Sequence, residues 1–308
     1  MDGNTIGTPL IMVLAEIQAD IQAIEDDGAI YQETNFNRRA NAIDFLDFHI
    51  IDRIEGLLQN PEQKEELTIL QQRAEKVKDD LEKIDANLFK QLREKIRTGI
   101  YTGASFREMI GRYFEHDVSP ADKIGYNNLD DFINGLLSDL TIPEATMEPE
   151  PEMVFYQKTP ARIIFEMATL ANLGQDDVFF DLGSGLGQVA ILVNLISGAT
   201  AKGIEYEPAY CNYANTCVSQ LNLSNVEFIN IDARLADYSQ GTVFFLYTPF
   251  EGEILQTVLE ILQKESLKRA TRIFTYGPCS EIVAQQSWLS CVHGEPDDPY
   301  QLCEFRSL

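Results

Sequence analysis

The sequence has few of the side chains that bind metals or build disulfide frameworks. Its 308 residues include 3 histidines and 5 cysteines, and no two cysteines form a Cys-x-x-Cys pair. Structural zinc sites and redox dithiols need closely spaced cysteines or histidines, so we expect no metal site and no disulfide framework. An odd number of cysteines without such spacing is typical of a reducing compartment, and we predict a cytoplasmic location.

Long apolar segments are also absent. The longest apolar stretches, around 10–15 and 189–196, are far shorter than the roughly 20 residues that a helix needs to cross a bilayer. The N-terminal residues 1–4 include no basic region of the kind that begins a secretory signal. We therefore expect neither a secretory signal nor a membrane partner.

Positive charge is scarce as well. The sequence has 24 Lys and Arg against 49 Asp and Glu, which gives a formal net charge of −25. Both halves are acidic, with 15 basic and 30 acidic residues in 1–150, and 9 and 19 in 151–308. Such a surface repels phosphate backbones, which makes DNA or RNA a disfavoured partner. A basic protein partner is compatible with this charge, but solubility alone also explains it.

The composition is otherwise that of a globular protein, with 44% hydrophobic and 24% charged residues. A chain of this length accommodates two domains of typical size. The segment 143–151 is rich in Pro and Glu, and it predicts an extended linker. We therefore predict a helical N-terminal domain over 1–142 and a second domain over 152–308.

The N-terminal half has the apolar periodicity of long amphipathic helices. We expect helices over about 8–27, 33–60 and 61–97, with Asn60-Pro61 separating the last two. Two such helices predict an antiparallel hairpin that packs within the chain. A homodimer through these N-terminal helices, or a docked partner, is the second hypothesis for the hairpin. The third helix has a heptad seam, formed by Leu67, Leu70, Ala74, Val77, Leu81, Ile84 and Leu88.

The C-terminal half alternates short β-rich runs with helical stretches. This alternation predicts an α/β fold of Rossmann-like type, with a mostly parallel, doubly wound sheet. The runs around 288–293 and 301–305 flank a turn-rich connector and predict a C-terminal β-hairpin. Together with five earlier runs they make a seven-stranded sheet. Those five runs are 177–182, 201–205, 226–232, 243–247 and 272–276.

A glycine-rich turn follows the first of these strands. It reads Gly183-Ser184-Gly185-Leu186-Gly187, and Asp181 stands two residues before it. Glu205 and Asp232 end the next two strands. Ligands of such sheets bind beyond the carboxyl ends of the strands, so we expect these groups to converge on one site. Glycines at the turn allow the backbone to approach a ligand closely.

Two classes of cofactor compete for this turn. Nicotinamide dinucleotides favour Gly-x-Gly-x-x-Gly, but Gln188 stands at the position of the third glycine. Asp181 would also oppose a pyrophosphate. S-adenosylmethionine has no phosphate, and its ammonium and sulfonium groups suit acidic residues. Its ribose hydroxyls suit Glu205 and its adenine amine suits Asp232, so we predict this cofactor.

The turn and its acids resemble the cofactor site of class I S-adenosylmethionine-dependent methyltransferases over about residues 152–308. Within that superfamily, the run 180–189 is similar to the disruptor-of-telomeric-silencing histone lysine methyltransferases. That family has Tyr-Gly-Glu-Thr in a loop over the methionine end of the cofactor, where this chain has Tyr156-Gln157-Lys158-Thr159. After the fourth strand the family has Asn-Asn-Phe, where residues 247–250 read Tyr-Thr-Pro-Phe. The basic nucleosome-binding segment of the family has no counterpart.

The motif and the resemblance together indicate the site residues. Thr159 has two alternative roles, as a ligand of the cofactor carboxylate or as the cap of the following helix. Aromatic residues near the acceptor stabilise a sulfonium or an amine by cation–π contact, and we assign Tyr156, Tyr247 and Phe250 to catalysis. The expected cofactor-binding residues are Asp181, Gly183, Ser184, Gly185, Gly187, Gln188, Glu205, Tyr206, Asp232, Ala233 and Thr159.

We therefore predict an enzyme that transfers a methyl group from S-adenosylmethionine to an acceptor. The resemblance favours a protein side chain as the acceptor, with lysine as the candidate. A small-molecule acceptor is the enzymatic alternative. A third hypothesis is a non-catalytic scaffold that binds the cofactor and recruits partners through the helical domain.

Overall fold

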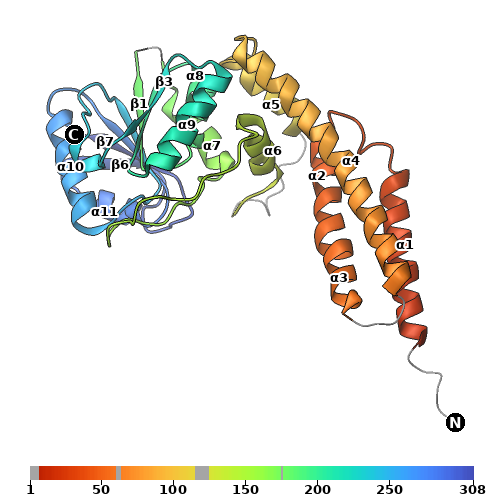
Figure 1. Cartoon of the computed structure of the whole chain (residues 1–308). Helices are drawn as coiled ribbons and strands as arrows, with labels where there is room; N and C mark the ends of the chain where they lie inside the picture. The colour runs from red at the N-terminus through yellow and green to blue at the C-terminus, as the bar shows by residue number, and fades with distance from the viewer. Residues whose placement is uncertain (1–6, 60–63, 115–124, 175) are drawn as a thin grey trace. The chain divides into compact units, whose positions relative to one another are not determined.

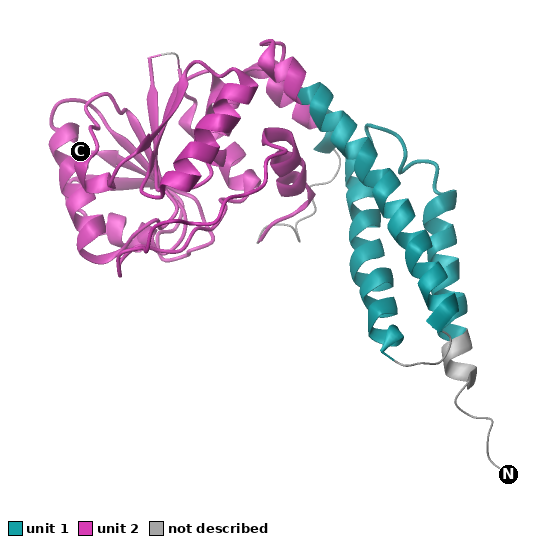
Figure 2. Cartoon of the chain, viewed as in Figure 1, with its two compact units in different colours: residues 1–92, 112–117 teal, residues 93–111, 118–308 magenta. Residues whose placement is uncertain are grey.

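The computed structural model describes residues 7–59, 64–114, 125–174 and 176–308, and side chains from residue 12 onward. By internal contacts the chain forms two compact units, residues 1–92 with 112–117 and residues 93–111 with 118–308 (Figure 2). The segment 143–151, where we predict a linker, is irregular and lies inside the second unit. The contact boundary thus falls N-terminal to the predicted domain boundary.

The first unit consists of antiparallel helices. It contains α1 (Gly7–Asp26), α2 (Phe36–Asp44), α3 (Asp52–Leu58) and most of α4 (Lys64–Arg97) (Figure 1). Side-chain contacts pair residue 47 with residue 78 and residue 55 with residue 71, so the predicted hairpin is antiparallel. The heptad seam of α4 faces the core, and its buried members are Leu67, Ala74, Val77, Leu81 and Leu88.

The second predicted helix is interrupted. A π-helical segment, η1 (Phe45–Ile51), separates α2 from α3. Asp47, which breaks the apolar seam, accepts hydrogen bonds from Lys78 Nζ at 2.7 and 2.8 Å. A π turn takes in one more residue than an α turn and shifts the phase of the helix. Leu46, Ile50 and Ile54 are all buried as a result.

The second unit contains the predicted seven-stranded sheet, in the order β3-β2-β1-β4-β5-β7-β6 (Figure 1). The first five strands are parallel, and β7 lies antiparallel between β5 and β6. This confirms both the Rossmann-like sheet and the C-terminal hairpin. The strands are β1 (Val178–Leu182), β2 (Thr200–Glu205), β3 (Val226–Asn230), β4 (Val243–Leu246), β5 (Arg272–Thr275), β6 (Leu289–His293) and β7 (Cys303–Ser307).

Helices cover both faces of the sheet. Figure 1 shows α8 (Gln188–Ser197) and α9 (Pro208–Leu221) on one side, and α10 (Gly252–Ser266) and α11 (Cys279–Ala284) on the other. The side chains of α10 and α11 pack with those of β1, β4, β5 and β7 in one hydrophobic core. The other helices of the unit are α5 (Ala104–Phe114), whose last residues belong to the first unit, α6 (Asn128–Leu137), α7 (Ala161–Ala171) and the short η3 (Ala233–Leu235).

The strand order reverses at β1, which pairs with β2 on one side and β4 on the other. The loops that follow β1 and β4 leave the sheet beside each other at this reversal. Open α/β sheets bind ligands in the crevice that forms there. The glycine-rich turn follows β1 and therefore stands at this crevice.

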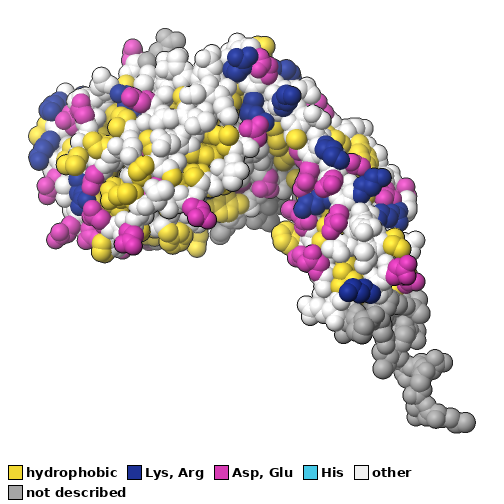
Figure 3. Space-filling model, in the orientation of Figure 1, with side chains coloured by type: hydrophobic (Ala, Val, Ile, Leu, Met, Phe, Trp, Pro, Cys, Tyr) yellow, Lys and Arg dark blue, Asp and Glu magenta, His cyan; other side chains and the backbone are white. Residues whose placement is uncertain are grey.

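Acidic and basic side chains are interspersed over the visible face of the helical unit (Figure 3). Within the ranges that the structure describes, no helix has the length and apolarity needed to span a membrane. In those same ranges, no cluster of three or more His, Cys, Asp or Glu is placed to hold a metal ion.

Candidate active site

A cleft of about 700 Å³ opens at the carboxyl ends of the parallel strands, which is within the usual range for small-molecule sites. Each of the five parallel strands contributes to its lining through its last residues or through the loop that follows it. Among the predicted site residues, the cleft is lined by Tyr156, Gly183, Glu205, Tyr206, Asp232, Ala233, Tyr247 and Phe250.

A second, smaller cavity adjoins the cleft and shares part of its wall. Tyr156, Gly183 and Tyr247 line both spaces. The remaining predicted residues that line the smaller cavity are Thr159, Asp181, Ser184 and Gln188. Only Gly185 and Gly187, of the predicted set, line neither space.

Among the buried polar atoms that have no hydrogen-bond partner within the described residues, three belong to residues that line the smaller cavity. They are Asp181 Oδ2, Ser184 Oγ and Gln188 Oε1. Native proteins pair nearly all of their buried polar groups with protein, water or ligand. The small cavity is therefore suited to a ligand group that both donates and accepts hydrogen bonds.

Asp181 is the carboxylate most affected by burial. It lies in the central strand, opposite Gly203 of β2 and Phe245 of β4. Burial, and secondarily the nearby charge of Glu205, raise the pKa of Asp181 from 3.8 to about 8. A cationic ligand group would restore the ionised form, because an opposite charge at short range favours the carboxylate.

Glu205 ends β2 and is held by backbone amides. Its Oε2 accepts from Gly185 N at 2.6 Å, and its Oε1 accepts from Glu207 N at 2.8 Å. Burial raises the pKa of Glu205, although these hydrogen bonds oppose the rise. The contact with Gly185 ties the carboxylate to the glycine-rich turn.

Asp232 follows β3 and is already engaged by a neighbouring arginine. Its Oδ1 accepts from the backbone N of Arg234 at 2.8 Å and from Arg234 Nε at 3.0 Å. The hydrogen bond with Arg234 lowers the pKa of Asp232. A ligand amine at Asp232 would therefore share this carboxylate with a guanidinium, which the sequence motif did not indicate.

Thr159 does not cap the helix that follows it. The N-cap of α7 is Pro160, which has no side-chain capping bond. The buried carboxylate of Asp130 provides an acceptor there instead, and Ala161 N donates to its Oδ1 at 2.7 Å. Of the two alternatives for Thr159, the cap is thus excluded, and its side chain lines the smaller cavity.

The glycines of the turn serve two different contacts. A Cβ on Gly183 would lie 2.2 Å from Pro249 Cβ, and one on Gly185 would lie 2.2 Å from Tyr156 Cε2. Both of these contacts are with loops that line the cleft. A Cβ on Gly187 would instead meet Phe228 and Ala214, at 2.5 and 2.7 Å. Gly187 therefore allows close packing of helix and sheet.

Four tyrosines gather at the end of the cleft that adjoins the smaller cavity. The rings of Tyr247 and Tyr276 lie 5.0 Å apart between centroids. Burial, and then the phenols of Tyr126, Tyr276 and Tyr300, raise the pKa of Tyr247 to about 12. All four residues line the cleft.

Sequence reasoning missed Tyr126, Tyr276 and Tyr300. Tyr276 directly follows β5, so its position at a strand end was an available signal. Tyr126 precedes α6 in the predicted helical domain, and no local pattern marks it. Phe250, which we assigned to catalysis, is buried in the hydrophobic core with Ile254 and borders the cleft from there.

One family model and several solved structures are similar to this chain. Residues 152–283 match the family described as "Histone methylation protein DOT1". No curated protein sequence matches the chain. An RNA methyltransferase from Salinibacter ruber, solved with S-adenosyl-L-homocysteine, is 26% identical over 49% of this chain and 92% of its own, with a TM-score of 0.40.

Two further solved structures are similar at lower identity. A SAM-dependent methyltransferase from Aquifex aeolicus is 16% identical over 48% of this chain and 93% of its own, with a TM-score of 0.38. Geranyl diphosphate C-methyltransferase from Streptomyces coelicolor A3(2) is 19% identical over 37% of this chain, with a TM-score of 0.31. This chain spans 42% of the length of that enzyme.

The unpaired atoms of the smaller cavity fit the amino-acid part of S-adenosylmethionine. Its ammonium group would be a donor for Asp181 Oδ2, and its carboxylate would be an acceptor for Ser184 Oγ, both of which lack a partner among the described residues. The strand order, the glycine-rich turn and the family match agree with this fit. The second unit is a class I S-adenosylmethionine-dependent methyltransferase domain, and it resembles the DOT1 family over residues 152–283.

Proposed function

We propose that this domain methylates an amine nitrogen of a protein acceptor, and specifically a lysine side chain. The observation that carries the proposal is the group of four tyrosines at the end of the cleft. Aromatic faces bind the aliphatic stem of a lysine by apolar contact and its ammonium group by cation–π attraction. The family description, which concerns histone methylation, points to the same class of acceptor.

The cofactor supplies an electrophilic methyl group on a sulfonium, so the protein has to bind, align and exclude water. We assign the ammonium group to Asp181 and to Gln188 Oε1, which accept hydrogen bonds, and the carboxylate to the hydroxyls of Ser184 and Thr159. Glu205 is the proposed acceptor for the ribose hydroxyls.

The adenine is assigned to the far part of the cleft. Tyr206 and Ala233 would flank its ring, and Asp232 would accept from its amine beside Arg234. These three residues line the cleft at the ends of β2 and β3. The glycine-rich turn gives the backbone room for the cofactor between this part and the smaller cavity.

The tyrosine hydroxyls would orient the acceptor. Arg162 Nη2 donates to Tyr276 Oη at 3.3 Å, which leaves the Tyr276 proton free for another acceptor. Tyr126 Oη donates to the Lys158 carbonyl at 2.6 Å. Because its pKa is raised, the Tyr247 phenol keeps its proton at neutral pH. Tyr247 therefore acts as a hydrogen-bonding group that aligns the nitrogen, and it is unsuited to act as a base.

The acceptor class is tested with labelled S-adenosylmethionine and a cell extract that is separated into protein and small-molecule fractions. Label in protein, released as methylated lysine after hydrolysis, supports the proposal. Label only in small molecules favours the enzymatic alternative. Cofactor binding without any labelled acceptor in an extract from the source cell favours the scaffold hypothesis.

Replacing Tyr247 with Phe tests the proposed role of the phenol. We expect the rate of methyl transfer to the labelled acceptor to fall by about three- to tenfold, the usual effect of losing one hydrogen bond. Calorimetric affinity for S-adenosylmethionine should stay within about twofold, because the ring and its packing remain. The matched control is Tyr31→Phe in the helical unit, which should change neither quantity. An unchanged transfer rate in Tyr247→Phe would remove this residue from the acceptor site.

Phe250→Ala is a poor test of the catalytic role assigned to Phe250, because the substitution would leave a cavity in the core.

A further inference from the structure

An extended segment of residues 144–156, which we call the strap, runs along the cleft. It contributes seven lining residues, namely Ala145, Met147, Pro149, Met153, Val154, Phe155 and Tyr156. The strap has no regular secondary structure apart from an isolated bridge between Met153 and Phe250. Something other than a helix or a sheet ladder must therefore hold it in place.

The first anchor of the strap is the carboxylate of Glu207. Its Oε2 accepts from the backbone N of Thr146 at 2.9 Å and from that of Met147 at 2.7 Å. Its Oε1 accepts from Thr146 Oγ1 at 2.6 Å and from Ala209 N at 2.9 Å. Burial acts to raise the pKa of Glu207, but these bonds outweigh it and lower the pKa, so the group stays ionised at neutral pH.

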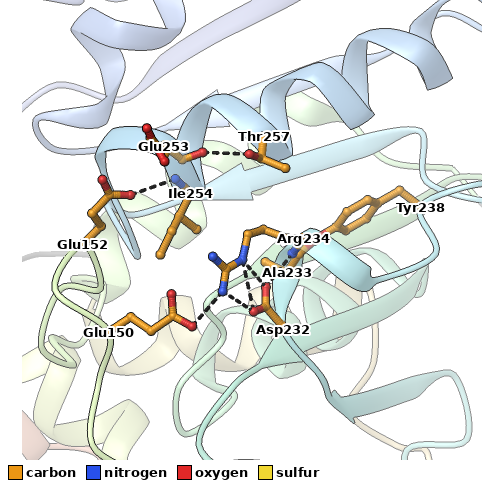
Figure 4. A network of polar contacts seen from close by, with 9 residues as sticks. All are labelled: Glu150, Glu152, Asp232, Ala233, Arg234, Tyr238, Glu253, Ile254 and Thr257. Atoms are coloured by element: carbon orange, nitrogen blue, oxygen red, sulfur yellow. Dashed lines mark hydrogen bonds and ion pairs between the residues drawn. The ribbon is translucent and has the colours of Figure 1, made fainter.

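The second anchor is an ion pair to Arg234. Figure 4 shows the guanidinium between two carboxylates, with Asp232 on one side and Glu150 of the strap on the other. Arg234 Nη2 lies 2.8 Å from Glu150 Oε1. The same arginine thus contacts the strap and the end of β3.

The third anchor lies at the start of α10. Ile254 N donates to Glu152 Oε2 at 2.9 Å, as Figure 4 shows. Glu251 N donates to the Glu152 carbonyl at 2.9 Å. A carboxylate at a helix N-terminus satisfies amides that the helix itself leaves unpaired.

Two of these anchors are adjacent in sequence to the proposed cofactor ligands. Glu207 follows Glu205 by two residues, and its backbone N donates to Glu205 Oε1 at 2.8 Å. Arg234 follows Asp232 by two residues and contacts its carboxylate. These two anchors therefore fix the strap beside Glu205, which is assigned to the ribose, and beside Asp232, which is assigned to the adenine.

We propose that Glu207 and Arg234 are positioning residues that hold the strap against the bound cofactor. The inference rests on the proposed cofactor roles of Glu205 and Asp232. A cofactor enclosed in this way leaves only when the strap moves, so breaking an anchor speeds its release. The strap carries four acids and no Lys or Arg between residues 144 and 156. Arg234 is the positively charged side chain among the three anchors, and it therefore offsets part of this negative charge.

Glu207→Gln is the most informative variant, because it retains the size of the side chain. Each carboxylate oxygen of Glu207 accepts from two donors, and at least one of the two is a backbone N–H. The NH₂ group of the new glutamine would replace one of these oxygens and cannot accept, so at least one backbone N–H would lose its acceptor. We expect S-adenosylmethionine to dissociate about tenfold or more faster, and to bind correspondingly more weakly. Arg234→Gln should act in the same direction. The matched control is Glu148→Gln, an exposed acid of the strap with the same change of charge.

The measurements use the full chain. Dissociation of labelled S-adenosylmethionine is followed after a chase with unlabelled cofactor, and affinity is measured by calorimetry. Thermolysin, which cleaves before apolar residues, reports on exposure of the strap at Met147, Met153 and Phe155. Thermal unfolding without cofactor shows whether a variant is folded. Glu207 is also the N-cap of α9, where it accepts from Ala209 N. Thr146→Val, alone and combined with Glu207→Gln, separates the strap contact from this capping, because residues in contact have non-additive effects.

Faster release and faster cleavage within the strap, in a variant that unfolds near the wild-type temperature, support the proposal. Non-additive effects of Thr146→Val and Glu207→Gln on release also support it. Wild-type release and wild-type cleavage in both Glu207→Gln and Arg234→Gln overturn it. So does an equal effect of Glu148→Gln. Absence of cofactor binding by the unmodified chain would refute the proposed function instead, and the two failures are thus distinguishable.

Discussion

Asp181→Asn is expected to weaken cofactor binding strongly and to stabilise the ligand-free protein. The carboxylate is buried, and its Oδ2 has no partner in the described part of the chain. Its proposed partner is the ammonium group of S-adenosylmethionine. Removing one member of a buried charge pair costs about 2–5 kcal/mol, so the affinity should fall by about 30-fold or more.

The stabilisation follows from the raised pKa of Asp181. The folded state holds the proton of this carboxyl more tightly than the unfolded state, since the pKa rises from 3.8 to about 8 on folding. Stability without cofactor therefore falls as the pH increases from about 4 to about 8. Asparagine does not ionise, so the variant avoids the cost of holding a charged carboxylate in the buried site. At pH 8 its free energy of unfolding should exceed that of the wild type by a few kcal/mol, as the size of the pKa shift implies.

Urea unfolding without cofactor, at pH 6 and pH 8, measures the stability, and calorimetry measures the affinity. The wild-type affinity should rise severalfold from pH 6.5 to 7.5, because the bound pair needs an ionised Asp181 and a protonated ammonium group. In Asp181→Asn this rise should be absent. The control is Asp176→Asn, an exposed acid two residues before β1. A variant that binds like the wild type, or that is less stable at pH 8, would contradict the assignment.

The sheet and the cofactor turn could be predicted because their signals are local. Buried parallel strands are short apolar runs, and acids such as Glu205 and Asp232 stand where those runs end. The parallel direction of the first five strands follows from the alternation of strands and helices, and the antiparallel pairing of β6 and β7 follows from the terminal hairpin. Each of these features depends on a few neighbouring residues, so it is visible in the sequence.

The strap and the acceptor end could not be predicted in this way, because long-range contacts define them. The Pro- and Glu-rich composition of 143–151 is that of a linker, but Glu207, about 60 residues further on, fixes the segment to the sheet. Tyr126 lies far from Tyr247 in sequence, and both line the same cleft. The π-helical segment 45–51 was not predicted either, because the apolar residues on both sides of it keep the spacing of an α-helix.

The three glycines of the turn also differ in a way that the sequence alone does not reveal. The sequence presents Gly183, Gly185 and Gly187 as equivalent, and only the packing distinguishes them. Gly187 faces Phe228 and Ala214, whereas Gly185 faces Tyr156. A substitution at Gly185 should therefore affect the site itself.

Gly185→Ala is expected to destabilise the domain and to remove cofactor binding. Gly185 has a φ of +52°, a conformation that costs an alanine about 1 kcal/mol. The new Cβ would lie 2.2 Å from Tyr156 Cε2, so the ring has to move. Tyr156 lines both the cleft and the smaller cavity, and Gly185 N donates to Glu205. We expect a loss of about 2–4 kcal/mol in stability and at least about 100-fold in affinity for S-adenosylmethionine.

Gly198→Ala separates the contact from the backbone strain. Gly198 ends α8 with a φ of +77°, and a Cβ there would meet no atom of the described chain within 4 Å. This control should lose only about 1 kcal/mol in urea unfolding and should bind the cofactor like the wild type. Tyr156→Ala in the Gly185→Ala background should recover part of the stability, because it removes the clashing ring. Equal losses in Gly185→Ala and Gly198→Ala would mean that strain alone acts, and that Tyr156 does not pack on the turn.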